Sequence, residues 1–131
     1  MTAEKLKNWL LEQDASLKGC IAVGCIDGNQ ECFVGVYDRE TPQNPICIGG
    51  LSQTLHLEKR FKVLVHWTHN AVKAEEKANA LYNLMWGKSH VVMDGVIVDV
   101  VDPGGCAIPV GKDDNGIYEY VIQIRLVYSR S

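Results

Sequence analysis

Two of the four histidines, His66 and His69, stand three positions apart and are the first candidates for a metal site. The residues around His66 alternate between apolar and polar, as in a β-strand, and strand positions three apart point to opposite faces of a sheet. His69 also falls in the turn before the next helical segment. The spacing therefore favours histidines that are solvated or cap the helix, and we predict no metal site.

The cysteines show no spacing that indicates catalysis or zinc binding. Their number is odd and none forms a CxxC pair, whereas zinc sites usually bring ligands in close pairs. Four of them lie on or beside apolar, strand-like segments, where a free thiol behaves as a small buried hydrophobe. These four are Cys20, Cys25, Cys32 and Cys47. Cys106 lies in a glycine-rich segment, where exposure would make it the most reactive thiol. Reduced structural cysteines are the expectation.

Carboxylates and glycines do not assemble into a recognisable catalytic or nucleotide motif either. Asp113-Asp114 and Glu75-Glu76 are adjacent acids, which in a turn or on a helix are most often solvated. The run Pro103 to Cys106 lacks the spacing of a phosphate-binding loop and precedes no helix whose N-terminus would hold an anion. We therefore predict no enzyme and no cofactor.

Composition sets the class of protein. The chain has 131 residues, 47% of them hydrophobic and 22% charged, which suits one compact domain over residues 1–131. A net charge of -3 argues against a nucleic-acid surface. Residues 1–13 contain too many charges for a signal peptide, and no apolar run is long enough to span a bilayer. The expectation is a soluble protein made in the cytosol, with no membrane partner.

The first third of the chain predicts a helix followed by two strands. Thr2 is a suitable N-cap for a helix from Ala3 to Gln13, whose apolar stripe would pack on the rest of the domain. Residues 20–26 and 32–37 are apolar runs separated by an Asp-Gly turn. This pattern predicts a β-hairpin.

The middle of the chain predicts a loop, a bent strand and a regular strand. Residues 38–45 are polar and contain two prolines, which indicates an exposed loop. Residues 46–57 suggest a strand bent at Gly49-Gly50. Residues 60–68 alternate cleanly, so that one face is suited to a core. The residues of that face are Phe61, Val63, Val65 and Trp67.

A second helix is predicted from Asn70, as N-cap, to Trp86, with Gly87 as a left-handed C-terminal residue. Its apolar stripe is rich in alanine, and small side chains let a helix approach a sheet closely. The stripe consists of Ala71, Ala74, Ala78, Leu81 and Met85. We expect this helix to lie across the sheet.

The last third predicts further strands around a long loop. Residues 91–101 are rich in β-branched side chains and are broken at Asp94-Gly95, while residues 118–128 alternate as one long strand. Residues 102–116 form a glycine-rich connection, and loops of this length are often functional. The order of elements indicates an α+β fold with a mainly antiparallel sheet, one helix across it and an N-terminal helix.

The text of the back half also resembles a known family. The segments that carry the likeness are RFKVLVHWTHNAVKAEEKANALYNLMWG, VIVDVVDPGG and YEYVIQIRLVYSR. In element order and residue character, the chain from about Gly19 to Arg130 resembles the minor capsid and tail terminator proteins of tailed bacteriophages and prophages, including the lambda-type terminator. This likeness rests on organisation and not on a diagnostic motif.

The resemblance implies a structural protein of the virion, assembled in the bacterial cytoplasm. Such proteins form rings, commonly hexamers, that stop growth of the tail tube and join the tail to the head. The implied partners are other copies of the chain, which form the ring on the tail, the tail tube protein and a connector protein of the head or neck.

Two loops are the candidate contact surfaces because of their length and polarity. The first contributes Asp102, Pro103, Gly104, Gly105, Lys112, Asp113 and Asp114, and the second contributes Asp38, Arg39 and Glu40. A head-completion or stopper protein of the connector is the alternative within the same particle. A small ligand-binding or thiol-dependent enzyme is the alternative outside it.

Overall fold

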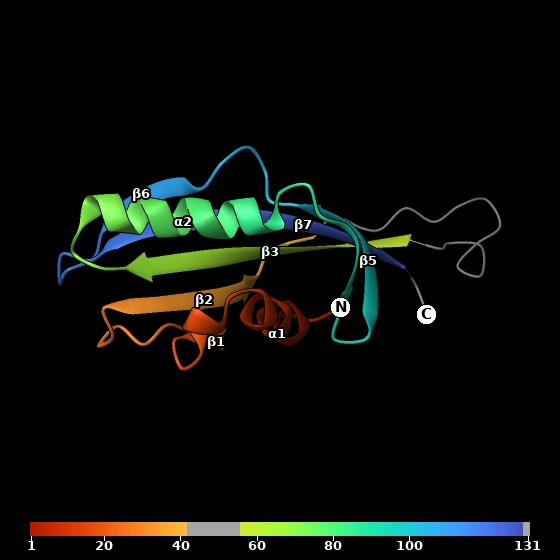
Figure 1. The fold of residues 1–131 in the computed structure, drawn as a ribbon, viewed down its shortest axis with the longest axis horizontal. Helices are drawn as coiled ribbons and strands as arrows, with labels where there is room; N and C mark the ends of the chain where they lie inside the picture. The colour runs from red at the N-terminus through yellow and green to blue at the C-terminus, as the bar shows by residue number, and fades with distance from the viewer. Residues whose placement is uncertain (42–55, 130–131) are drawn as a thin grey trace.

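The computed structural model describes residues 1–41 and 56–129 (Figure 1). Two α-helices, one short 3₁₀ helix and seven strands make up the described part, which confirms the predicted α+β class. The elements are α1 Ala3–Gln13, η1 Ala15–Leu17, β1 Ile21–Val23, β2 Cys32–Asp38, β3 His56–Trp67, α2 Ala71–Met85, β4 Ser89–Met93, β5 Val96–Asp102, β6 Ile108–Lys112 and β7 Tyr118–Ser129.

The strands form one mixed, mostly antiparallel sheet. Its order is β1-β2-β3-β7-β5-β4, and β6 pairs with β7 beside this path. The centre is the long antiparallel pair of β3 and β7, in register from His56 opposite Ser129 to His66 opposite Glu119. The other edge of β7 pairs with two strands in turn. β5 pairs with the C-terminal part of β7, and β6 pairs with its N-terminal part.

The core lies on one face of this sheet. Phe61, Val63 and Val65 of β3 are fully buried, and the register places Ile122 and Ile124 of β7 on the same face. Side chains of both helices belong to the same hydrophobic cluster. The alternation predicted for these two strands is therefore confirmed, and the opposite face carries mainly polar side chains.

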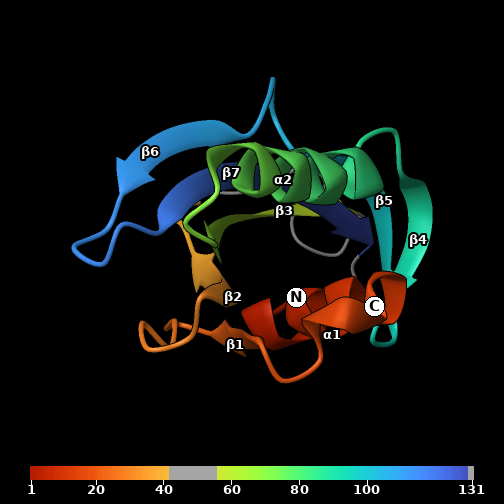
Figure 2. The same ribbon diagram turned by 60° about the vertical axis from the view of Figure 1, so that its left-hand side comes forward.

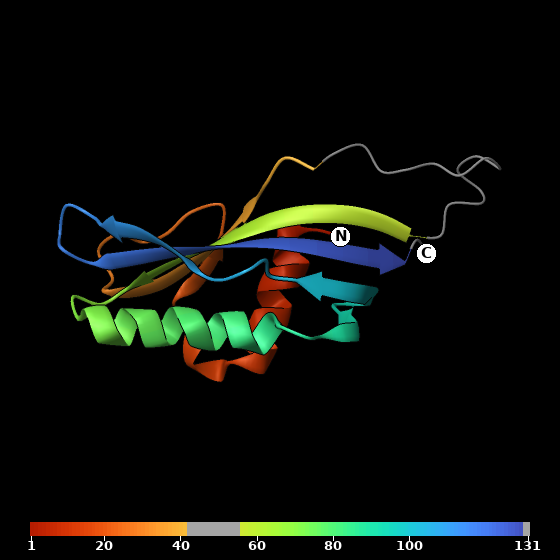
Figure 3. The ribbon, with the colours of Figure 1, turned by 90° about the horizontal axis from the view of Figure 1, so that it is seen from above.

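The helices cover different parts of that face. α2 packs along the central strands β3 and β7, where Ala74 and Ala78 are fully buried. α1 contacts β1 and β2 at one end of the sheet and β4 at the other, so it bridges the two ends of a strongly curved sheet (Figure 2). Seen from above, α1 runs across the direction of α2 (Figure 3).

The helix boundaries follow the predicted caps. The Thr2 side chain accepts a hydrogen bond from the amide of Lys5, and the Asn70 side chain accepts from the amides of Val72 and Lys73. Gly87, just beyond α2, has a φ of 73°, which an L-residue with a side chain adopts only under strain. Both helices thus begin where the sequence predicts.

The predicted hairpin of residues 20–26 and 32–37 is wrong. β1 is only three residues long and pairs with β2 in parallel, with Ile21 opposite Val34. At Gly24, with a φ of 75°, the chain leaves the strand and crosses β2. The crossing is close to Gly35, because a Cβ there would lie 3.0 Å from the carbonyl oxygen of Cys25. The glycine permits a crossover that the local Asp-Gly signal does not reveal.

Three other expectations need correction or lie outside the described residues. Residues 102–116 are not a continuous loop, because they contain β6, which completes the edge of β7. Asp38, predicted in a loop, is the last residue of β2. The bent strand predicted over residues 46–57 falls mostly outside the described part, and only His56 and Leu57 are seen, as the start of β3. Residues 91–101 form two strands, β4 and β5, with Asp94-Gly95 between them.

Candidate functional site

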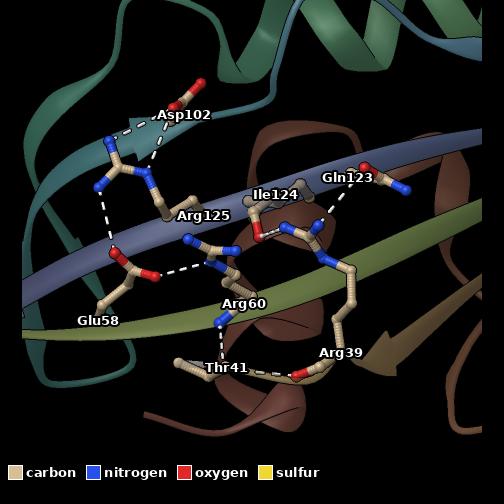
Figure 4. Close-up of polar contacts among 8 residues, drawn as sticks. All are labelled: Arg39, Thr41, Glu58, Arg60, Asp102, Gln123, Ile124 and Arg125. Carbon is tan, nitrogen blue, oxygen red and sulfur yellow. Dashed lines mark hydrogen bonds and ion pairs between the residues drawn. The ribbon is translucent and has the colours of Figure 1, made fainter. Parts of the chain in front are cut away.

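The face of the sheet opposite the helices carries a cluster of three arginines (Figure 4). Arg60 of β3 and Arg125 of β7 are opposite each other in the register, at positions that alternate with core residues. Arg39 follows the last residue of β2. Together with Asp102, Gly104 and Gln123, they line a pocket of about 210 Å³. We call this set the arginine pocket.

Arg39 is held in place by uncharged acceptors. Its Nη2 donates to the carbonyl oxygen of Ile124 at 3.2 Å, and its Nη1 donates to Oε1 of Gln123 at 3.4 Å. Its Nε is buried and has no hydrogen-bond partner among the residues that the structure describes. Burial and the neighbouring Arg60 lower the pKa of Arg39, against the opposing effect of Glu58. Arg39 is thus a half-buried cation without an ion pair within residues 1–41 and 56–129.

The other two arginines are partly neutralised. Arg60 Nε donates to Glu58 at 2.7 Å, and Arg125 contacts both Glu58 and Asp102 at 3.4 Å. Thr41 connects the two segments, because its hydroxyl accepts from the Arg60 amide at 2.9 Å and donates to the Arg39 carbonyl. Three cations and two carboxylates leave an excess of one positive charge at the pocket.

The pocket brings together residues from both predicted contact loops. Arg39 comes from the second predicted loop, and Asp102 and Gly104 come from the first. Within the first loop, Asp102 caps the turn by accepting from the Gly104 amide at 3.0 Å. Tyr82 of α2 anchors the same turn, since its hydroxyl donates to the Gly104 carbonyl at 2.7 Å. The remaining members of these two loop segments do not line the pocket, and these are Asp38, Glu40, Pro103 and Gly105.

The rest of the first predicted loop lies elsewhere. Lys112 ends β6, and Asp113 and Asp114 form the turn to β7, beyond the end where β3 meets α2. Asp113 accepts from the amides of Ile117 and Asn115, and these bonds, the Ile117 bond foremost, lower the pKa of its carboxyl. This acid organises a turn, and the arginine pocket does not include it.

His66 is not solvated, as the spacing had suggested, but fully buried. Its Nδ1 lies 3.0 Å from Glu119 and 3.7 Å from Asp113, and its Nε2 has no partner among the described residues. His69 is exposed, near Glu31 and the Asn115 carbonyl. Within the described part, no three His, Cys, Asp or Glu side chains are arranged to hold a metal ion.

The thiols are less buried than predicted. Cys20 and Cys32 are half-buried, and burial raises the pKa of both. Cys25 and Cys106 are exposed. All four are free thiols, and Cys47 lies outside the described residues. A raised pKa disfavours the reactive thiolate.

A second feature of the surface is exposed apolar side chains on the strands at the margin of the sheet. In the β4–β5 hairpin, Val92 and Ile97 are cross-strand partners with exposed fractions of 59% and 52%. In β6, every residue is exposed, including Ile108 and Val110. Large apolar side chains in this number on edge strands are typical of surfaces that bind protein.

The sequence interpretation did not single out Arg60, Arg125, Gln123 or Glu58. All four were visible as polar positions that alternate with core residues in two long strands. The sequence does not show the strand register. That register places Arg60 opposite Arg125 and brings the end of β2 beside them.

A charged pocket on a polar sheet face and apolar side chains on edge strands fit a protein that works through contacts with other proteins. No helix in the described part is long and apolar enough to cross a membrane. The family model of bacteriophage tail terminator proteins matches residues 25–130. The chain belongs to this family, whose members are structural proteins of the phage tail.

Other comparisons add little to the family match. A search of curated proteins finds no significant match. One solved structure that matches is 17% identical to this chain, with 96% of this chain and 87% of that chain covered and a TM-score of 0.48.

Proposed function

We propose that this protein forms a ring at the end of the tail tube, stops the tube from growing and provides the surface to which the head or neck joins. The observation that carries the proposal is the family match, which spans residues 25–130. The match includes the whole central sheet and α2 but only part of the N-terminal region.

The surface of the chain is consistent with self-association. A ring needs two different surfaces on each subunit, because head-to-tail contacts close only when one surface meets another. The polar face of the sheet, on the side away from the helices, is a candidate for one of these two surfaces. The exposed apolar pair Val92 and Ile97 at the β4 edge is a candidate contact with the tube or the connector. Closure of the ring then leaves one rim matched to the tube and the other free for the connector.

Tube growth in the presence of the protein tests the proposal. Purified tail tube protein from the same phage would be polymerised with increasing amounts of this chain, and tube lengths measured by electron microscopy. We expect shorter tubes with a ring of extra density at one end. Tubes of unchanged length without such density would contradict the proposal.

A matched pair of variants connects this activity to the apolar edge. Ile97→Glu places a charge in the exposed cross-strand pair, whereas Asn29→Glu adds the same charge in an exposed turn. Termination should weaken in the first variant and persist in the second. If both variants terminate tubes as the unmodified protein does, the β4–β5 edge has no part in assembly.

A further inference from the structure

The arginine pocket has the donors and the charge to hold one additional carboxylate. The Nη1 and Nη2 atoms of Arg39 each carry two N–H groups and donate one hydrogen bond apiece within the described residues, and the pocket carboxylates Glu58 and Asp102 leave one positive charge of the three arginines in excess. Arginine binds carboxylates through paired, charge-assisted hydrogen bonds. Residues 42–55, which follow this part of the chain, contain no aspartate or glutamate.

The charges around the pocket select against a polyanion. Glu58 and Asp102 lie on the same surface as the arginines, and the chain carries a net charge of -3. Like charges next to a binding site oppose a ligand whose charge extends past the pocket, as a nucleic acid backbone does. A single carboxylate on a protein side chain fits the excess charge better.

The same chain presents a carboxylate on its opposite side. Glu76 lies on α2 with Val72 and Asn79 on the side that faces solvent, and Glu75 is adjacent. Both glutamates are exposed, and neither makes an ion pair within the described residues. Val72 beside them is 65% exposed. These two adjacent glutamates stand on a rigid helix, whereas Asp114 lies in a turn and Glu12 is a single carboxylate in the last turn of α1.

We propose that the arginine pocket of one copy accepts the Glu76 carboxylate, with Glu75 beside it, from α2 of a second copy of this chain. The inference rests on the proposed ring. The pocket is on the uncovered face of the sheet, and the solvent side of α2 is on the other face of the molecule. Two different surfaces on opposite sides are what a head-to-tail contact requires. In this arrangement Arg39 obtains the ion pair that it lacks in the single chain.

Charge reversal tests the contact. The variants are Arg39→Glu, the double variant Glu75→Lys/Glu76→Lys, and Lys18→Glu as a control that reverses an exposed charge elsewhere. Sedimentation velocity at rising protein concentration and low salt measures self-association. We expect roughly tenfold weaker association, or more, for the first two variants and no change for the control. Added salt should weaken the association of the unmodified protein.

Mixing the two charge-reversed variants gives a sharper result. One variant retains an intact pocket and the other retains the intact glutamates, so the native contact can form between them, and the two reversed surfaces are complementary as well. Each variant should associate weakly alone, and an equimolar mixture should recover association. Circular dichroism and thermal unfolding check the folds. If Arg39→Glu does not fold, the self-association of the double variant Glu75→Lys/Glu76→Lys still tests the contact, because those residues lie on the solvent side of α2.

Several outcomes would overturn the inference. One is unchanged association of the α2 double variant, and another is an unmodified protein that stays monomeric at every concentration. Binding of duplex DNA that Arg39→Glu abolishes would instead assign the pocket to a phosphate. The proposed function is tested separately. If the unmodified protein and both charge-reversed variants terminate tubes equally well, the proposed function is supported and the pocket contact is wrong.

Discussion

Arg39 and Asp102 line the same pocket on the uncovered face of the sheet, although they belong to segments that are far apart in the sequence. Arg39 follows β2 and Asp102 ends β5, and both strands reach this place through the central pair β3 and β7. Arg125 of β7 contacts Asp102, and Gln123 of β7 contacts Arg39. One strand, β7, therefore positions both segments.

Removal of a core side chain from α1 should destabilise the whole fold. Leu6 is fully buried in the shared core, and α1 bridges the two ends of the sheet. Leu6→Ala should lower the free energy of unfolding by about 2–5 kcal/mol, through lost burial and the cavity that remains. Urea denaturation followed by circular dichroism measures the change. Val72→Ala, on the exposed side of α2, is the control and should change stability by less than about 0.5 kcal/mol.

The turn between β4 and β5 depends on glycine. Asp94 and Gly95 have φ values of 49° and 83°, the pattern of a type I′ hairpin turn. Gly95→Ala should cost about 1–2 kcal/mol because a Cβ disfavours the left-handed conformation. Gly105→Ala is the matched control, since its φ lies outside that region and a Cβ there would meet no atom within 4 Å. Equal unfolding midpoints for the two variants would contradict this account of the turn.

An ion pair between the helices should make stability depend on pH in the acid range. Lys77 of α2 donates to Asp14, the residue after α1, at 2.6 Å. Burial raises the pKa of Asp14, but the hydrogen bonds from Lys77 and Ser16 outweigh it and the net pKa is lowered from 3.8. The carboxylate thus stabilises the folded state above the unfolded pKa of about 4, and this contribution is lost as the pH falls through the depressed folded pKa.

Thermal unfolding from pH 7 to pH 3 checks this dependence. Asp14→Asn should be less stable than the unmodified protein at neutral pH, and the difference between the two should shrink toward pH 3. A difference that does not vary with pH would assign the role of Asp14 to its neutral hydrogen bonds with Ser16.

The Tyr82 hydroxyl should hold the turn that borders the arginine pocket. It donates to the Gly104 carbonyl at 2.7 Å and so joins this turn to α2. Tyr82→Phe should cost about 0.5–1.5 kcal/mol, the usual net value of one hydrogen bond. Hydrogen exchange should increase at residues 103–106 and not at β3. Unchanged exchange at that turn would show that the Asp102 cap alone maintains it.

The parts of the fold that the sequence determined are those that follow from short-range chemistry. Thr2 and Asn70 mark the helix starts because their side chains accept from amides two or three residues ahead. The period of two in β3 and β7 identifies the buried face because successive side chains on a strand point to opposite sides. The α+β class followed from these elements and their order.

Long-range pairing decided the rest. The Asp-Gly signal at residues 27–28 predicted a hairpin, yet β1 pairs with β2 in parallel because the chain crosses over Gly35. β6 arises inside the glycine-rich connection because β7 offers an unpaired edge there. The same register buries His66 and joins Arg39, Arg60 and Arg125 in one pocket. Contacts between distant residues depend on the whole sheet, and no local pattern in a single sequence encodes them.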